Sequence, residues 1–248
     1  ALTFHGLMTI TVNVHEDTDT IVLNAGPKMT LGKAQIMSDA LKTDSKTIAT
    51  LEQDAAHERV TAKLAQKLPK GSKATISIAF GAEIDNSMMG YYRSTCEFDG
   101  KKGFYALTQF EPTAARRAFP GFDEPALKAT YSFKMIHKKD STALANMPIV
   151  GEAKPISAAE QEKLLMLSEL EVDTSKVKSN LKTESSSAGK TEDGDWVLTS
   201  FEDIPKVSTY LVAWANGPFV HLESSYKSPL TGKDINLRIY STPEYIHQ

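Results

Sequence analysis

The feature that most constrains the fold of this 248-residue chain is the alternation of apolar and polar side chains along most of its length. Met8, Ile10, Val12 and Val14 share one side of such a pattern, and residues 73–84 repeat the pattern. Because successive side chains of a β-strand point to opposite faces, a period of two predicts strands with one buried face. Six further segments show the same period: 20–25, 103–111, 129–138, 195–201, 207–214 and 235–241.

At least eight expected strands and almost no long helix predict a mainly-β, antiparallel domain. Hydrophobic residues make up 41% of the chain, which is enough for a sizeable core. We therefore expect residues 1–248 to form a single β-domain.

Residues 156–194 interrupt the succession of expected strands. Ser157 and Glu160 have the spacing of a helix capping box, and the leucines of 161–171 follow a helical period. Residues 173–195 are mostly Ser, Thr, Lys, Glu, Gly and Asp, with too few apolar side chains to form a core. We interpret 156–194 as an insertion between two strands, with a short helix followed by a flexible part.

Charge and apolar content argue against two classes of partner. The 28 basic and 31 acidic residues leave a net charge of only −3, so nothing indicates nucleic-acid binding. No stretch approaches the ~20 apolar residues of a membrane-spanning helix, so no membrane partner is expected.

Cys96 is the single cysteine and no Asn-x-Ser/Thr site occurs, which favours a cytoplasmic protein. We interpret Cys96 as a structural thiol, since nothing beside it in the sequence would lower its pKa.

The sequence lacks the ligands of a catalytic zinc site. Zincin peptidases use two His residues on successive turns of a helix, with a Glu between them as general base. The His-Glu pair at 15–16 is followed by Asp19 where the second His would stand, and the pair at 57–58 is followed by Thr61. We therefore expect the chain to bind no zinc and to contain no catalytic residue.

The most informative stretch for chemistry is 108–125. If the strand before it continues through Glu111, then Gln109 and Glu111 lie side by side on one face. Pro112 then ends the strand and suits the first position of a short helix over 113–118. A carboxylate at the end of a strand, next to a rigid proline, is well placed to hold a cation.

A second interpretation of Glu111 gives it no function beyond the fold. Arg116 and Arg117 follow within one or two turns of chain, and either could form an ion pair with the Glu111 carboxylate. The residues alone leave both interpretations open.

Residues 108–125 resemble the segment that characterises the M1 family of zinc aminopeptidases. Residues 89–94, 145–148 and 205–213 resemble neighbouring segments of that family, in the same order. The puromycin-sensitive-like, cytosolic branch is most similar, and its fungal members resemble this chain near its C-terminal end.

This resemblance implies a fold and a function for a longer protein. The family's N-terminal region is a saddle-shaped antiparallel β-domain, and a thermolysin-like catalytic domain with a His-Glu-x-x-His helix follows it. The resemblance implies that this catalytic domain comes after residue 248, that it binds zinc, and that the full-length protein removes N-terminal amino acids from peptides. By the match, Glu111 binds the free α-amine of the substrate, and Gln109 lines the pocket for the first side chain. The chain alone is expected to be inactive.

The resemblance is incomplete at three places. The family's first strand is missing before Ala1, Gly121 stands where a Cys is common, and the insertion at 156–194 is long. Two other functions are therefore weighed: a non-catalytic binding or scaffold module with the same fold, and a bifunctional relative with epoxide-hydrolase activity. The Gln-Phe-Glu-Pro sequence at 109–112 argues against the epoxide hydrolase, since that branch has a different pattern there.

Overall fold

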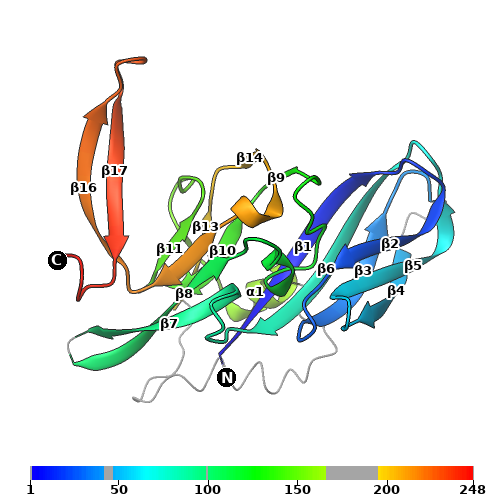
Figure 1. The fold of residues 1–248 in the computed structure, drawn as a ribbon, viewed down its shortest axis with the longest axis horizontal. Helices are drawn as coiled ribbons and strands as arrows, with labels where there is room; N and C mark the ends of the chain where they lie inside the picture. Colours follow the sequence, from blue (N-terminus) through cyan, green and yellow to red (C-terminus); the bar gives the residue numbers. More distant parts are fainter. Residues whose placement is uncertain (1, 42–46, 99, 166–194, 248) are drawn as a thin grey trace.

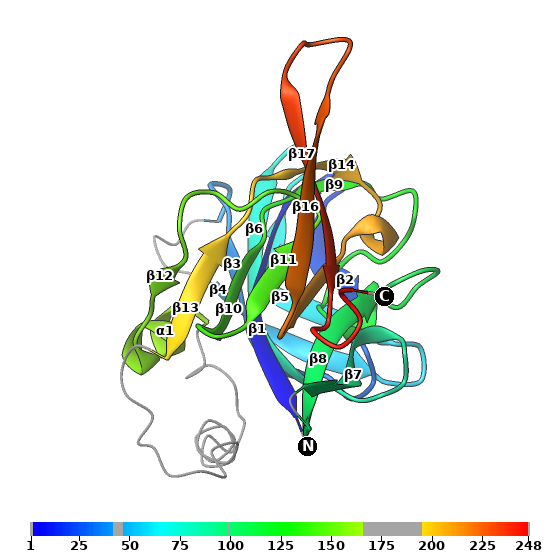
Figure 2. The same ribbon diagram turned by 90° about the vertical axis from the view of Figure 1, so that its left-hand side faces the viewer.

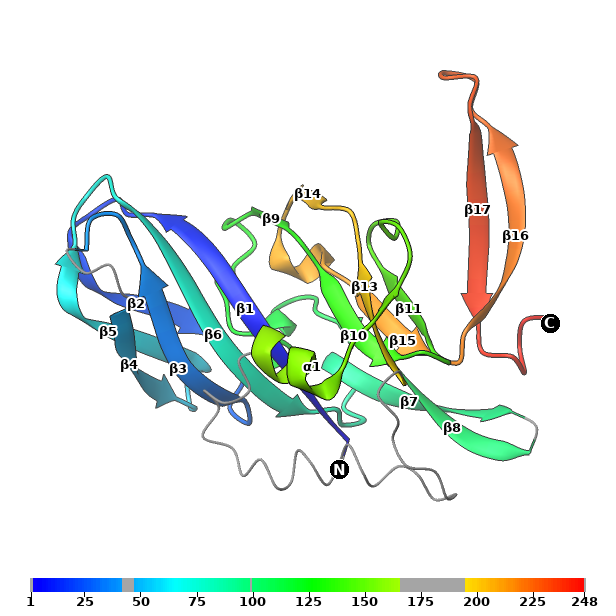
Figure 3. The same cartoon turned by 180° about the vertical axis from the view of Figure 1, so that it is seen from behind.

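A computed structural model describes residues 2–41, 47–98, 100–165 and 195–247. Every strand pair in these ranges is antiparallel, and one short α-helix is present among them. The prediction of a mainly-β antiparallel domain is confirmed. Figures 1 and 3, drawn from opposite sides, show a large sheet at one end of the molecule and a separate hairpin at the other.

The large sheet has six strands in the order β1-β6-β3-β4-β5-β2. These are β1 (Thr3–Asn13), β2 (Thr18–Asn24), β3 (Thr30–Met37), β4 (Thr47–Asp54), β5 (Arg59–Leu68) and β6 (Lys73–Glu83). Its core comes from the alternating apolar positions of the sequence: Ala74, Ile76 and Ile78 on β6 are at most 1% exposed. The period of two therefore predicts correctly which face of β6 is buried.

The second half of the chain forms smaller sheets beside the first. A four-stranded sheet has the order β11-β15-β8-β7, and a three-stranded sheet has the order β10-β13-β12. The four-stranded sheet contains β7 (Gly90–Phe98), β8 (Lys101–Gln109), β11 (Thr142–Ala145) and β15 (Trp214–Gly217). The other strands are β10 (Lys134–Lys138), β12 (Lys154–Pro155), β13 (Trp196–Ser200) and the antiparallel pair β9 (Ala129–Tyr131) and β14 (Ile204–Val207).

An aromatic cluster centred on Trp214 joins these smaller sheets. The Trp214 ring lies 4.9 Å from Phe133, 5.1 Å from Phe110 and 5.7 Å from Tyr91, measured between ring centroids. Phe4 of β1 packs edge-on against Tyr91 at 5.1 Å, which connects the cluster to the six-stranded sheet. Aromatic pairs at such distances stabilise the fold beyond the area that they bury.

The last two strands stand apart from both halves. β16 (Val220–Lys227) and β17 (Asp234–Ser241) pair only with each other among the described strands. In Figure 2 the hairpin projects beyond the rest of the molecule.

Two predicted strands are shorter or interrupted in the structure. The segment 129–138 divides into β9 and β10, because Ser132 donates a hydrogen bond to Asp203 and Phe133 stacks on Trp214. The strand predicted over 207–214 is wrong: Thr209–Leu211 forms a 3₁₀ helix instead.

The predicted capping box is confirmed, and part of the insertion lies outside the described residues. Ser157 accepts a hydrogen bond from the Glu160 backbone, and the Glu160 side chain accepts one from the Ser157 backbone. The helix α1 that follows covers Ala158–Leu164, and residues 166–171 of the predicted helix lie outside the described residues. Residues 166–194, and with them nearly all of the segment predicted to be flexible, lie outside the described residues.

Candidate functional site

The candidate site lies where the chain leaves β8. The sequence predicts that the strand continues through Glu111. In the structure β8 ends at Gln109, so Glu111 lies two residues beyond the strand. Gln109 pairs with Gly90, the first residue of β7, so the pairing of β8 with β7 ends there. Phe110 is 2% exposed and packs into the aromatic cluster beside Trp214 and Phe119, while Gln109 and Glu111 on either side of it are exposed.

Gln109 and Glu111 remain neighbours in spite of the early strand end. The Gln109 side-chain amide donates a hydrogen bond to the backbone carbonyl of Glu111 at 3.3 Å. In the described parts of the chain, the Glu111 carboxylate forms no hydrogen bond or ion pair of its own. The structure therefore presents an exposed carboxylate that is free to accept a ligand.

The predicted alternative, an ion pair from Glu111 to Arg116 or Arg117, is not formed. A short 3₁₀ helix, η1 (Ala115–Arg117), directs both arginines toward other carboxylates. The Arg116 Nε atom lies 2.9 Å from the Asp123 carboxylate, and both arginines lie within 3.6 Å of Glu58.

Asp123 is the centre of a buried network in this segment. Its side chain is 3% exposed and accepts hydrogen bonds from the Arg116 backbone at 3.1 Å and from the Arg116 Nε at 2.9 Å. The Thr209 hydroxyl donates to the other Asp123 oxygen at 2.7 Å. Burial raises the pKa of Tyr131, and the negative charge of Asp123 adds to this shift. A buried carboxylate with this many donors fixes the positions of the residues around it.

Further backbone contacts hold the segment against the six-stranded sheet. Gly26 donates its backbone amide to the Arg116 carbonyl at 2.6 Å, and Asn24 exchanges two backbone hydrogen bonds with Gly121. The Asn24 side chain also accepts from the Asp123 backbone at 3.1 Å. In Figure 1 this connection between β8 and β9 lies between the six-stranded sheet and the second half of the chain.

The start of β7 borders the site and requires a glycine. Gly90 is the register partner of Gln109 and has a φ of +74°. A Cβ at Gly90 would come within 2.8 Å of the Arg117 Cβ, so a larger residue would displace η1. Next to Gly90, the Met89 thioether accepts a hydrogen bond from Arg117 at 3.7 Å and is 38% exposed. No local pattern in residues 89–94 predicts that the Met89 side chain lies against Arg117.

Two other candidate groups do not contribute to this site. The described residues contain no cluster of three His, Cys, Asp or Glu side chains that could hold a metal, so a zinc ion does not fit them. Cys96 is buried, and this burial raises the pKa of its thiol, which suits a structural residue better than a nucleophile. Within the described ranges there is also no helix whose length and apolar content would let it span a membrane.

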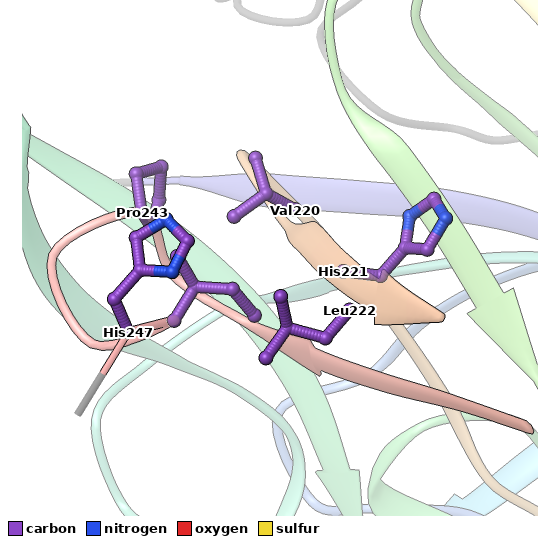
Figure 4. Close-up of a pocket in the computed structure, with 6 residues that line it drawn as sticks. Val220, His221, Leu222, Pro243 and His247 are labelled. Carbon is purple, nitrogen blue, oxygen red and sulfur yellow. The ribbon is translucent and has the colours of Figure 1, made fainter. Parts of the chain in front are cut away.

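A separate shallow depression of about 290 Å³ lies at the foot of the β16–β17 hairpin. Figure 4 shows Val220, Leu222, Pro243 and His247 around it. Its lining is mainly apolar and includes no residue of the Glu111 segment. We therefore treat it as part of the hairpin and not of the candidate site.

Comparison with protein families identifies the first two thirds of the chain. The sequence model of the Peptidase M1 N-terminal domain matches residues 1–162. This range contains β1 to β12 and the whole of the Glu111 segment.

Curated relatives match the whole chain but are much longer. It is 30% identical over 246 residues to Aminopeptidase 2 of Candida albicans, covering 99% of this chain and 21% of that protein. It is 32% identical over 248 residues to Endoplasmic reticulum aminopeptidase 1 of Rattus norvegicus, covering 100% of this chain and 22% of that protein. It is 32% identical over 245 residues to Aminopeptidase M1 of Arabidopsis thaliana, covering 97% of this chain and 22% of that protein. The chain thus spans about a fifth of the length of these relatives.

Proposed function

Since the chain belongs to the peptidase M1 family, as its N-terminal domain, we propose that it anchors peptide substrates in a zinc aminopeptidase that removes N-terminal residues. In this proposal the Glu111 carboxylate binds the free α-ammonium group of the peptide. The zinc ion belongs to the rest of the polypeptide, because the described residues of this chain offer no metal-binding cluster.

The observation that carries the proposal is the unpaired Glu111 carboxylate on a rigid support. Phe110 and Pro112 flank it, and the buried Asp123 network holds the segment that follows. The backbone that carries Glu111 therefore loses little further freedom when the carboxylate binds a ligand, so more of the interaction free energy appears as affinity.

An aminopeptidase must distinguish the end of a peptide from its middle. Only the N-terminal end carries an ammonium group, which can donate charge-assisted hydrogen bonds to a carboxylate. Fixing this ammonium group also fixes which peptide carbonyl reaches the catalytic centre. A carboxylate on a non-catalytic domain can in this way define where the peptide is cut.

In this proposal Gln109 lines the pocket for the first side chain of the substrate, beside the Glu111 carboxylate. Its amide nitrogen is used by the Glu111 carbonyl, and its amide oxygen has no hydrogen-bond partner in the described part of the chain. A neutral, exposed amide contacts a substrate side chain without a large electrostatic effect. We expect Gln109→Ala to change the relative kcat/KM among first side chains by roughly tenfold, with a smaller change in overall rate.

The test uses the full-length protein with Glu111→Ala and, as a matched control, Glu124→Ala. Glu124 is an exposed carboxylate in the same segment. Loss of a charge-assisted contact worth roughly 2–5 kcal/mol should lower kcat/KM of Glu111→Ala for free-amine substrates by about 30-fold to several thousandfold. The control should retain wild-type kinetics, and both variants should melt within about 2 °C of wild type.

Two results would count against the proposal. If Glu111→Ala retained near-normal kcat/KM while its melting temperature fell by several degrees, Glu111 would be a structural residue. If the full-length protein hydrolysed no aminoacyl substrate, a non-catalytic binding module would be the better interpretation of this fold.

The 248-residue chain alone should bind no zinc and hydrolyse no aminoacyl anilide. None of the described residues forms a cluster that could activate water. Metal analysis and an activity assay of the purified chain test this expectation. One tightly bound zinc per chain, with activity lost on chelation, would contradict it.

We also propose that the protein is cytoplasmic. The single Cys96 and the lack of Asn-x-Ser/Thr sites support a reducing compartment. Fractionation of cells that produce the full-length protein tests this, and recovery in a membrane or luminal fraction would contradict it.

A further inference from the structure

His137 is a buried histidine that the candidate site does not use. It lies on β10 opposite Val197 of β13, and it is 5% exposed. Thr199 of β13 is on the same face of this strand pair and is 2% exposed. A polar side chain that is removed from water in this way depends on hydrogen-bond partners within the fold.

Both ring nitrogens of His137 have such partners, and these partners determine which nitrogen carries the hydrogen. The Nδ1 atom lies 2.9 Å from the backbone carbonyl oxygen of Lys138, which can only accept, so Nδ1 is the donor. The Ser141 hydroxyl donates to the same carbonyl, and its oxygen accepts from Nδ1 at 3.1 Å. Nε2 is then the unprotonated nitrogen of a neutral ring, and the Thr199 hydroxyl donates to it at 2.8 Å.

A second proton on this ring has no suitable acceptor. It would lie on Nε2 and face the oxygen of Thr199, whose hydroxyl hydrogen has no other acceptor in the described part of the chain. Within the described ranges no carboxylate forms an ion pair with His137 that could balance the added charge. Burial lowers the pKa of His137 below its ordinary value, and the hydrogen bonds to Lys138 and Ser141 oppose only part of this shift.

The elements around His137 do not supply a compensating charge either. β13 contains no titratable residue, and neither does β11, whose Ala143 packs in the same small core as Met135. The charged residues on the strand pair, on β12 and on the adjoining turns are Lys134, Lys138, Lys139, Asp140, Lys154 and Asp195. All except Lys138 are exposed, and the Lys138 ammonium group lies over the Trp196 ring, 4.7 Å from its centroid.

We infer that His137 and Thr199 form an acid-sensitive lock between β10 and β13. The neutral ring keeps the lock closed through its hydrogen bond with Thr199, and protonation opens the strand pair so that the charged ring reaches water. An open pair binds the proton at the ordinary pKa of histidine, about 6.5, whereas the closed pair binds it only at lower pH. The stability that the lock provides is therefore complete above this ordinary pKa and is lost as the pH falls toward the lowered one. The inference does not depend on the proposed function.

Opening of the strand pair would reach the aromatic cluster. Phe133 and Phe201 continue β10 and β13 beyond the lock, and the Phe201 backbone amide donates to the Phe133 carbonyl at 3.2 Å. The Phe133 ring stacks on Trp214, which also contacts Phe110. Acid therefore weakens one side of the cluster that holds the residue before Glu111.

Hydrogen exchange of the full-length protein at pH 7.5 and pH 5.0 tests the inference without any enzyme assay. The quantity compared is the protection factor, which removes the intrinsic dependence of amide exchange on pH. Amides of 134–138 and 196–200 should lose protection at least about fivefold at pH 5.0. Residues 60–64 of β5, a strand without histidine, are the internal reference and should keep their protection. Equal protection of β10 and β13 at the two pH values would overturn the inference.

Variants without the titrating ring provide the second test. His137→Phe with Thr199→Val replaces both hydrogen-bonding partners by apolar groups of similar size, and this change should make the protection of β10 and β13 the same at both pH values within about twofold. His137→Gln, which keeps an amide beside Thr199, should act in the same way if the double variant does not fold.

The matched control is His57→Gln. The His57 side chain is 71% exposed in the turn between β4 and β5, so this variant should lose protection in acid as the wild type does. If the variants at position 137 retained the acid sensitivity of β10 and β13, or if His57→Gln removed it, the lock would not be formed by His137.

Discussion

The two ends of the segment between β8 and β9 each carry a carboxylate, and they are built in opposite ways. Asp123 is buried and accepts hydrogen bonds from Arg116 and Thr209. Glu111 is exposed and has no ion pair or side-chain hydrogen bond with any described residue. A carboxylate whose oxygens are all engaged within the fold contributes to stability, while one held in place without a partner is able to bind a ligand. We therefore attribute a stabilising role to Asp123 and propose a recognition role for Glu111.

The largest expected effect on folding comes from Asp123→Ala. This change leaves the Arg116 guanidinium, whose side chain is 14% exposed, without its main partner. We expect the free energy of unfolding of the chain to fall by about 3–5 kcal/mol. Denaturant unfolding measures this loss, and Glu111→Ala is the control, with an expected change within about 0.5 kcal/mol. Equal losses in the two variants would remove the distinction between the two ends.

A smaller loss is expected from Thr209→Val, which removes one donor and preserves the shape of the side chain. The Thr209 hydroxyl donates to Asp123 at 2.7 Å, and without it one buried oxygen lacks a donor. The expected cost is roughly 1–3 kcal/mol in the free energy of unfolding. Thr113→Val, at an exposed position of the same segment, is the control and should cost little. If both valine variants were equally stable, the hydrogen bond to Asp123 would not matter for folding.

The smallest effect should come from Glu58→Gln. Its carboxylate lies 3.6 Å from Arg116 and 3.5 Å from Arg117, at a partly exposed position. Ion pairs of this kind contribute about 0–1 kcal/mol and are screened by salt. Glutamine keeps the side-chain shape and the same preference at the positive φ of residue 58, so the comparison isolates the charge. If Glu58→Gln lowered the free energy of unfolding as much as Asp123→Ala, or if its loss persisted in 1 M salt, Asp123 would not be the centre of the network.

The strands of this fold could be predicted from sequence because their signal is local. In β6 alternate residues are apolar, so the buried face can be predicted from the local sequence without knowledge of distant contacts. The strand predicted over 207–214 failed for a long-range reason. Ser208 and Thr209 donate their hydroxyls to Pro125 and Asp123, which bends the chain into a 3₁₀ helix.

The candidate site shows the same division between local and distant information. Gln109 and Glu111 are recognisable from their strand and the proline that follows. Asp123, in contrast, is held by Asn24 and Thr209, which are 99 and 86 residues away in sequence. No local pattern indicates such contacts, so the sequence could not decide between Glu111 and other carboxylates as the partner of Arg116. Only the fold shows that Asp123 takes that partner and leaves Glu111 free.

The most direct measurement of the central claim compares an inhibitor that carries an α-amine with its des-amino analogue. Inhibition constants for both are measured on the full-length wild type and on Glu111→Gln, which preserves side-chain shape. If Glu111 binds the ammonium group, removal of the amine should weaken inhibition of the wild type strongly and that of the variant only slightly. The coupling free energy between the amine and the carboxylate should be at least about 1.5 kcal/mol. The same loss in both proteins, and hence a coupling near zero, would contradict amine recognition by Glu111.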